Sequence, residues 1–192
     1  MTKIAVWCRH AQDNIIGIGA QIPWKILSDF KRFRRITEGQ SLVAGEKTYE
    51  TFPNRTLPNR KIYVLTFNLD YQVSDVENHF VVTDINKFQN FDGNLFIAGG
   101  ASIYKAFMTG NENLMPEIIV DSMFKGDINP NLKGEQINIT PCIDVMKSEY
   151  DKVSTDYELD DVITTVWVKK GSSPDKKILQ HIITAIEADG EK

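Results

Sequence analysis

Apolar and polar positions along the chain predict strands that alternate with helices. Apolar runs of strand length occupy residues 3–8, 41–44, 61–66, 79–82, 95–98 and 117–123. Helices are predicted over residues 26–37, 84–91 and 101–108. Residues 148–157 and 162–169 suit an antiparallel pair, residues 9–21 and 52–60 suit loops, and residues 125–142 show no regular pattern. This alternation predicts an α/β fold with a mainly parallel central sheet, flanking helices, and ligands at the carboxyl ends of the strands.

The predicted helix over residues 26–37 carries the most informative polar residue. Its apolar stripe consists of Ile26, Phe30 and Phe33, and its charged face of Lys31, Arg32 and Arg35. Asp29 falls inside the apolar stripe, where loss of water raises the pKa of a carboxyl group. An acidic residue in the first turn also stabilises a helix through the helix dipole, which is the alternative explanation. We interpret Asp29 as a buried acid in a cleft, a setting that favours proton transfer.

Composition and charge narrow the possible functions. The chain has 192 residues, of which 42% are hydrophobic and 25% charged, and its net charge is −4, as is ordinary for one globular domain. The basic residues are scattered apart from those of the first helix, so nucleic-acid binding has little electrostatic support. Cys8 and Cys142 suggest no disulfide framework, and we find neither a leader nor an apolar run of membrane length. We therefore expect a cytoplasmic protein that does not bind a membrane.

Glycines follow two of the predicted strands, where they would let a ligand approach the backbone closely. Gly45-Glu-Lys-Thr48 ends one strand and opens a helix, although its spacing does not fit a phosphate-binding P-loop. Gly99-Gly100 separates a strand from the helix over residues 101–108.

No metal is expected, because the three histidines lie far apart in the sequence: His10, His79 and His181.

The C-terminal residues predict one more helix. Ser173-Pro174-Asp175 is typical of a capped helix start. An apolar stripe follows it, made of Ile178, Leu179, Ile182, Ile183 and Ile186. We expect this helix to pack on its own domain in a monomer, and the alternative is a subunit contact that mediates a dimer.

Several motifs, taken together and in order, resemble the dihydrofolate reductase family. They are Ile16-Gly17, Ile22-Pro23-Trp24, Asp29 with Phe33 and Thr37, residues 45–50, Leu57-Pro58-Asn59-Arg60, residues 97–104, and Gly126-Asp127. The likeness covers about residues 3–170 and is strongest to the enzymes of lactic-acid bacteria. We therefore assign residues 1–170 to a dihydrofolate reductase domain and residues 171–192 to a helical extension. The resemblance implies a mainly parallel sheet with an antiparallel C-terminal strand, and NADPH-dependent reduction of 7,8-dihydrofolate to tetrahydrofolate.

The resemblance also implies roles for residues of a substrate site. Asp29 would grip the pterin ring and support protonation of N5 while a hydride reaches C6. Arg60 would bind the α-carboxylate of the glutamate, a contact that suits a guanidinium group. The other substrate-binding residues that it implies are Trp7, Cys8, Phe30, Phe33, Phe52, Leu57 and Asp121. Antifolate-type small molecules would bind the same site.

For the cofactor, the resemblance implies a covering loop and a phosphate-binding region. Residues 9–25 would form a mobile loop over the nicotinamide, with the catalytic residue Trp24 at its base. Gly99-Gly100 matches the family's cis peptide, and Thr48 with residues 100–104 would hold the pyrophosphate. The full set of implied cofactor-binding residues is Ile16, Gly17, Gly45, Glu46, Lys47, Thr48, Leu65, Thr66, Phe67, Ala98, Gly99, Gly100, Ala101, Ser102, Ile103 and Tyr104.

The chain departs from the family pattern in two places. Asp121 stands where the family usually has a threonine hydrogen-bonded to the acid, and a second carboxyl group beside Asp29 would raise one pKa further. Glu46 and Thr66-Phe67 stand where the family usually has basic residues for the 2′-phosphate, so we expect NADPH with a reduced preference over NADH. Two other functions stay open, a related pterin or pyrimidine reductase on the same fold and a non-enzymatic nucleotide-binding module.

Overall fold

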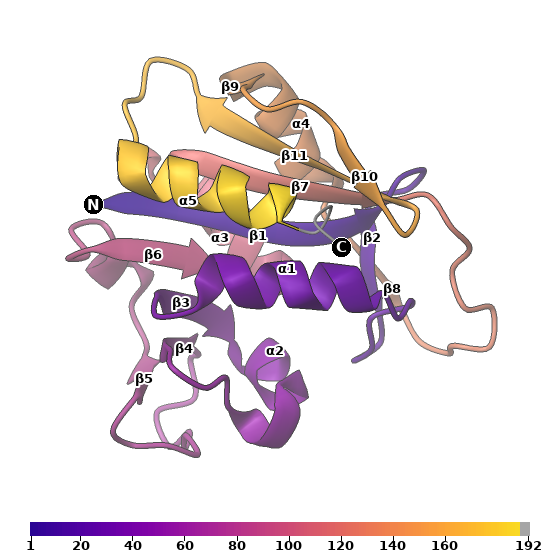
Figure 1. Ribbon diagram of the computed structural model, residues 1–192. Coiled ribbons are helices and arrows are strands. Elements are labelled where there is room, and N and C mark those ends of the chain that lie inside the picture. Colours follow the sequence, from indigo (N-terminus) through magenta and orange to yellow (C-terminus); the bar gives the residue numbers. More distant parts are fainter. Residues whose placement is uncertain (189–192) are drawn as a thin grey trace.

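A nine-stranded sheet forms the centre of the computed structural model, which describes residues 1–188 (Figure 1). The strands lie in the order β10-β11-β7-β1-β6-β3-β4-β5, and β9 pairs with β11. Their bounds are β1 Thr2–His10, β3 Ser41–Gly45, β4 Lys61–Leu65, β5 His79–Val82, β6 Asn94–Ile97, β7 Ile118–Phe124, β9 Tyr150–Lys152, β10 Tyr157–Leu159 and β11 Val162–Lys169.

The sheet is parallel from β5 across to β7 and antiparallel around β11, so the predicted arrangement is confirmed. Its register places Trp7 opposite Asp121, and Cys8 opposite Ser122. Ser122 in turn lies opposite Thr164 on β11. Because side chains alternate between the two faces of a strand, Cys8, Ser122 and Thr164 share one face of the sheet. Trp7 and Asp121 point to the other face.

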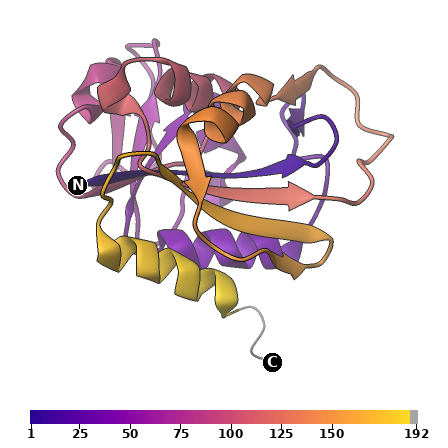
Figure 2. The same cartoon turned by 90° about the horizontal axis from the view of Figure 1, so that it is seen from above.

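Helices cover both faces of the sheet (Figure 2). Helix α1, Leu27–Thr37, and helix α5, Lys176–Glu187, lie on one face, and α3, Ala101–Thr109, and α4, Thr140–Glu149, lie on the other. Helix α2, Glu46–Thr51, directly follows β3. Short 3-10 helices occupy Pro53–Arg55, Ile85–Phe88 and Glu112–Leu114. The helix predicted over residues 84–91 is therefore a shorter 3-10 turn.

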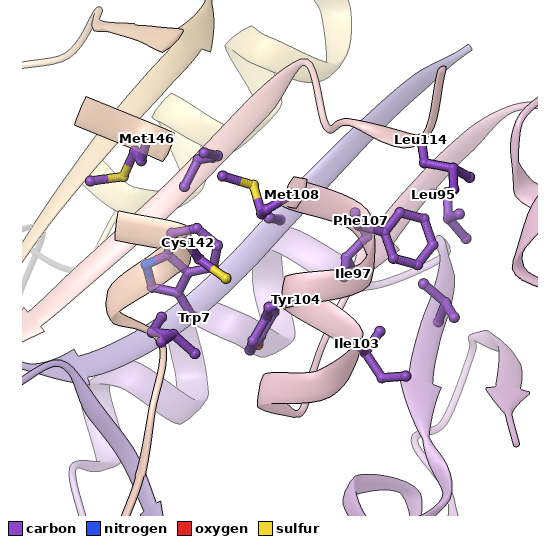
Figure 3. Close-up of a cluster of buried hydrophobic side chains, with 14 of the residues drawn as sticks. Trp7, Leu95, Ile97, Ile103, Tyr104, Phe107, Met108, Leu114, Cys142 and Met146 are labelled. Carbon is purple, nitrogen blue, oxygen red and sulfur yellow. The ribbon is translucent and has the colours of Figure 1, made fainter. Parts of the chain in front are cut away.

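Two apolar clusters hold the helices against the sheet. Beneath α1 and α5 lie Ile4, Val6, Ile36, Leu42, Phe96, Ile118, Val120, Val166, Ile178, Ile182, Ala185 and Ile186. The other cluster joins strand residues to α3 and α4, and its labelled members are Trp7, Leu95, Ile97, Ile103, Tyr104, Phe107, Met108, Leu114, Cys142 and Met146 (Figure 3). Removing this apolar surface from water is the main stabilising contribution to the fold.

Helix α5 packs on its own domain, as we expected from its apolar stripe. The Asp175 side chain caps the helix by accepting from two first-turn amides. Arg35 Nε of α1 donates to the Ala185 carbonyl at 3.1 Å, and His181 Nε2 lies 3.1 Å from the Ile36 carbonyl. These contacts hold α5 against the C-terminal end of α1. Residues 189–192 of the predicted extension lie outside the described residues.

Two segments that the sequence analysis treated as irregular contain regular structure. Strand β2, Ile15–Ile18, lies within the predicted loop and pairs with β8, Gln136–Asn138. Helix α4 begins at the end of the segment over residues 125–142 and runs to Glu149, so the strand predicted from residue 148 begins two residues later. The β2–β8 partners are far apart in the sequence, and the local pattern of one strand does not reveal a distant partner.

Candidate active site

Asp29 lies in the first turn of α1, with its side chain 20% exposed. The carboxyl group is therefore partly desolvated yet open to a ligand, rather than fully buried as we predicted. Phe30, which we placed in the apolar stripe, is instead 48% exposed. Phe33 is partly buried against the cluster beneath α1. An acid and an exposed ring side by side on one helix end are suited to a flat ligand that carries N–H groups.

Arg32 contradicts the prediction that it belongs to an exposed charged face, because it is only 1% exposed. Its Nη1 donates to Thr164 Oγ1 at 2.6 Å and lies 3.8 Å from Asp29 Oδ1. The guanidinium carbon stands 5.4 Å over the Tyr157 ring. Residues three apart are neighbours on a helix surface, so the position of Arg32 follows from that of Asp29.

Asp121 is 2% exposed, and a cation accompanies it. Its Oδ1 accepts from Trp7 Nε1 at 2.7 Å and from Arg9 Nε at 2.8 Å, while its Oδ2 accepts from Arg9 Nη2 at 2.9 Å. We expected a second carboxyl group beside Asp29, but Asp121 points to the other face of the sheet, and Arg9 supplies the opposite charge to it. The neighbouring residue of β7, Ser122, points to the face of the sheet that α1 covers. Its Oγ lies 3.0 Å from Thr164 Oγ1.

Apolar side chains from three segments gather beside α1. Phe33 of α1, Leu57 and Ala98 all pack against the cluster beneath that helix. Leu57 also joins Phe52 at a smaller cluster made of Tyr49, Ile62 and Val64. The structure therefore brings Phe33, Phe52 and Leu57 of the predicted wall to neighbouring positions. Such surfaces can contact an aromatic ligand over its faces and edges.

Arg60 lies in the loop before β4, packed beside the C-terminal end of α1, and is 6% exposed. Its Nε donates to Thr37 Oγ1 at 2.9 Å, Nη2 donates to the Arg34 carbonyl at 2.6 Å, and Nη1 donates to the Pro58 carbonyl at 2.5 Å. A guanidinium group has five N–H donors, so two more can bind a carboxylate. A cavity of about 440 Å³ is lined by Leu57 and Arg60 among other residues. This region has room for an acidic ligand group beside a cation fixed in place.

Trp24 and Cys8 connect the N-terminal loop to the acid. Trp24 is 8% exposed, and its ring centroid lies 5.1 Å from that of Phe124. Burial raises the pKa of the Cys8 thiol, and the nearby charges of Asp29 and Asp121 raise it further, whereas a hydrogen bond to Trp24 opposes the shift. Cys8 therefore remains a neutral thiol in this polar region.

The N-terminal loop is anchored at β2. Ile16 packs against the cluster on the α3 and α4 face, and Gly17 pairs with Ile137 of β8. A cavity of about 820 Å³ is lined by residues 21–27 together with Phe124, Asp127, Asn129, Leu132, Asp160 and Asp161. The predicted covering loop therefore rests on a strand pair rather than on irregular chain alone.

The glycines of two strand ends meet where α2 and α3 begin. The Gly45 amide donates to the Gly99 carbonyl at 2.8 Å, and the peptide between Gly99 and Gly100 is cis, as the resemblance implies. A Cβ atom on Gly100 would lie 3.0 Å from Thr48 Oγ1, and one on Gly99 would lie 3.0 Å from the Tyr104 ring. Neither helix has a side-chain cap at its N-cap residue. The backbone thus forms a cradle where two helices begin, which fits a phosphate group.

The rest of the predicted cofactor set continues from this cradle. Ala98 and Ala101 are partly buried, Ser102 is exposed, and Ile103 is buried against the Gly45 backbone. The Tyr104 hydroxyl donates to the Val6 carbonyl of β1 at 2.6 Å. Burial raises the pKa of Tyr104, and the charge of Asp29 contributes to that rise. Tyr104 therefore lies beside the cradle at Gly99 and within electrostatic range of Asp29.

Glu46 occupies the position next to the cradle where the resemblance implies a basic residue. Its Oε2 accepts from Thr66 Oγ1 at 2.5 Å, which joins the ends of β3 and β4. Lys47 is exposed, Leu65 is partly buried, and Phe67 is 94% exposed. The described side chains therefore offer a carboxylate and an exposed ring at this edge.

Within residues 1–188, no group of three or more His, Cys, Asp or Glu side chains could hold a metal ion. Over the same residues, no helix is both long and apolar enough to cross a membrane. Both cysteines are free thiols.

Sequence reasoning missed four side chains near the two acids, namely Arg9 at Asp121, and Arg32, Thr164 and Ser122 on the side of Asp29. Arg32 could have been found from its i+3 spacing to an acid in an apolar stripe. The other three needed the strand register, because β1, β7 and β11 become neighbours only in the folded sheet.

Comparisons with known proteins agree with this geometry. The family model described as dihydrofolate reductase matches residues 3–159. A dihydrofolate reductase of Staphylococcus aureus is 28% identical over 124 residues, which cover 65% of this chain and 75% of the relative. A dihydrofolate reductase of Enterococcus faecium is 29% identical over 128 residues, which cover 65% of this chain and 74% of the relative. The structure of a dihydrofolate reductase from Enterococcus faecalis complexed with NADP(H) and RAB-propyl has the same fold, with a TM-score of 0.67, 22% identity, and 88% of this chain and 96% of that chain covered. The chain belongs to the dihydrofolate reductase family.

Proposed function

We propose that this chain reduces 7,8-dihydrofolate to tetrahydrofolate with NADPH. The observation that carries the proposal is the partly exposed carboxyl group of Asp29 in the first turn of α1, in a chain that matches the family model over residues 3–159. The glycine cradle, where Tyr104 lies within electrostatic range of Asp29, supports a phosphate-bearing cofactor beside the same site. The structure of the related Enterococcus faecalis enzyme in complex with NADP(H) supports the choice of cofactor.

Each part of the proposed substrate site has a distinct task. Ionised Asp29 accepts hydrogen bonds from N–H groups of the pterin and supports protonation at N5. Phe30, Phe33 and Leu57 contact the flat rings, and antifolate-type molecules bind the same surfaces. Arg60 holds the glutamate α-carboxylate with its two remaining donors, in a charge-assisted contact.

The proposed cofactor site uses backbone more than side chains. Gly45, Thr48 and residues 100–104 would hold the pyrophosphate at the N-terminus of α3, where the helix dipole favours negative charge. When bound, NADPH supplies the hydride that is added at C6 of the substrate. Trp24 and the chain anchored at β2 exclude water from the nicotinamide side. Glu46 reduces the preference for NADPH over NADH, because its charge repels a 2′-phosphate.

We also propose a division of the chain and a setting for it. Residues 1–170 form the catalytic domain and residues 171–192 an extension whose described helix braces α1. Because α5 buries its own apolar stripe, the chain acts as a monomer. Two free thiols suit a reducing compartment such as the cytoplasm.

The test is the oxidation of NADPH by the purified chain, with and without dihydrofolate. We expect oxidation that depends on dihydrofolate and is lowered by orders of magnitude in Asp29→Asn, whereas NADPH affinity stays nearly unchanged. The deficit should shrink as the pH falls, since substrate then arrives already protonated. Asp144→Asn, on exposed α4 surface, is the matched control and should be fully active. Undiminished turnover by Asp29→Asn at neutral pH would refute the assignment.

A further inference from the structure

Arg32 is a buried cation at the edge of the proposed pterin site, and the proposed reaction gives it no task. It is among the largest fully buried side chains of the described residues, at 1% exposure. A guanidinium group cannot lose its charge in a protein, so burial demands compensating interactions. The structure supplies a hydroxyl acceptor at 2.6 Å on Thr164, the face of the Tyr157 ring at 5.4 Å, and the Asp29 carboxylate at 3.8 Å.

The Thr164 contact ties Arg32 to the sheet rather than to its own helix. Thr164 is 1% exposed on β11, and its Oγ1 also lies 3.0 Å from Ser122 Oγ on β7. Two strands therefore hold the guanidinium group, while the Tyr157 ring covers it. A cation fixed in this way cannot follow a moving carboxylate. Asp29, at the more exposed end of the pair, must instead orient toward the cation.

We propose that Arg32 is a positioning residue of this site, which keeps the Asp29 carboxylate ionised and in one orientation for the N–H groups of a bound pterin. This inference rests on the proposed function only for the identity of the ligand. The effect of Arg32 on the charge state of Asp29 can be measured without any ligand. The charge of Arg32 opposes the rise in the pKa of Asp29 that its place in the apolar stripe predicts. An opposite charge within about 4–6 Å lowers a carboxyl pKa by roughly 1–3 units.

Other charged and titratable groups lie near this pair. The Cys8 thiol of β1 and Tyr157 of β10 lie on its side of the sheet, whereas Asp121 of β7 with Arg9, and Tyr104 of α3, lie toward the other face. Arg9 compensates the charge of Asp121. Cys8 and Tyr104 stay neutral, because the pKa of each is raised by burial. Of these groups, Arg32 supplies a charge that favours ionised Asp29.

The direct test is a pH titration of the Asp29 carboxyl carbon by NMR, in the ligand-free chain labelled at aspartate carboxyl carbons. The resonance is assigned by its loss in Asp29→Asn. In the wild-type chain we expect a midpoint at or below the ordinary value of about 3.9. In Arg32→Met, which keeps the length and removes the charge, the midpoint should rise by roughly 1–3 pH units. Arg32→Lys should keep most of the low midpoint, since it restores the charge.

The matched control is Arg35→Met, which removes the same charge from the same helix. Arg35 donates to the Ala185 carbonyl of α5 and lies six residues after Asp29 in α1, beyond the i+3 and i+4 positions that neighbour the acid, so the midpoint should stay within about 0.3 units of wild type. If the midpoint rises equally in Arg32→Met and Arg35→Met, the cause is the total charge of the helix and not the position of Arg32, and the proposal is overturned. A wild-type midpoint above the ordinary value would overturn it as well, even if Arg32→Met does not fold.

Ligand binding supplies the second readout. In wild type, the dissociation constant of dihydrofolate should change little between about pH 8 and pH 5.5, because Asp29 stays ionised over that range. In Arg32→Met it should weaken more across the same interval, by up to about 25-fold for a midpoint raised by roughly 3 units, since Asp29 becomes protonated as the pH falls. NADPH affinity should be unaffected. A chain that fails to oxidise NADPH with dihydrofolate would refute the proposed function, whereas a titration midpoint that ignores Arg32 would refute the positioning role alone.

Discussion

The charge at residue 46 should set how strongly the chain distinguishes NADPH from NADH. Glu46 accepts a hydrogen bond from Thr66 at the junction of β3 and β4, beside the cradle. The family resemblance places the 2′-phosphate of NADPH at this junction. A phosphate there meets a carboxylate, and it also loses the Thr66 hydroxyl as a donor because Glu46 has engaged it. Both effects act on NADPH and spare NADH, which carries a free 2′-hydroxyl at that position.

The magnitude follows from Coulomb's law. Two unit charges about 5 Å apart interact by roughly 1–3 kcal/mol when the effective dielectric constant lies between about 80 and 20. Glu46 is only partly buried, so the lower half of that range is the better guide. Glu46→Gln should therefore improve kcat/KM for NADPH by about 5–15-fold, since 1.4 kcal/mol corresponds to a factor of ten. Glu46→Arg, which adds an attractive charge and frees Thr66, should improve it further, to about 30–100-fold.

Steady-state kinetics with both cofactors tests this reasoning. The value of kcat/KM for NADH should stay within about threefold of wild type in both variants, because NADH has no charge at the affected position. Glu50→Arg is the matched control, since it makes the same charge change on exposed surface of α2, and it should leave the ratio of the two cofactors unchanged. The gain for NADPH should shrink with added salt. A large wild-type preference for NADPH that Glu46→Arg leaves unchanged would show that Glu46 does not face the phosphate.

Three further outcomes can be measured. Arg60→Leu should weaken dihydrofolate binding by about 2–4 kcal/mol, the scale of a lost charge-assisted pair, while a pterin without the glutamate should bind both proteins alike; equal losses for both ligands would make Arg60 structural. Deleting residues 172–192 should lower the free energy of unfolding by about 3 kcal/mol or more, because it uncovers the isoleucine contacts beneath α5, and light scattering should show a monomer before and after the deletion. Burial lowers the pKa of His79, so the folded chain disfavours its protonated form. The thermal midpoint should therefore fall as the pH drops below about 6.5, and His79→Gln should show a smaller fall than wild type.

Elements with strong local periodicity were predictable from the sequence. The strands at residues 41–45 and 61–65 and the helix that carries Asp29 appear where the apolar spacing placed them. The pairing of Gly45 with Gly99 was not visible locally, yet both follow strands of one parallel sheet, and such strands end at the same edge. Periodicity and topology together were therefore enough to bring the cradle and the acid into one region.

The charged neighbours of the acid were not predicted correctly, for a physical reason that applies more widely. A helical wheel assigns charges to water, which is correct for the exposed Lys31 and wrong for Arg32, three residues after Asp29. A partly buried acid stabilises a buried cation and the reverse, so the two enter the protein together. The same pairing explains Arg9 and Asp121, which were unreadable as partners because they lie on different strands. An acid within an apolar stripe is thus itself a reason to search for a cation at i+3 or i+4, before assuming that its pKa is raised.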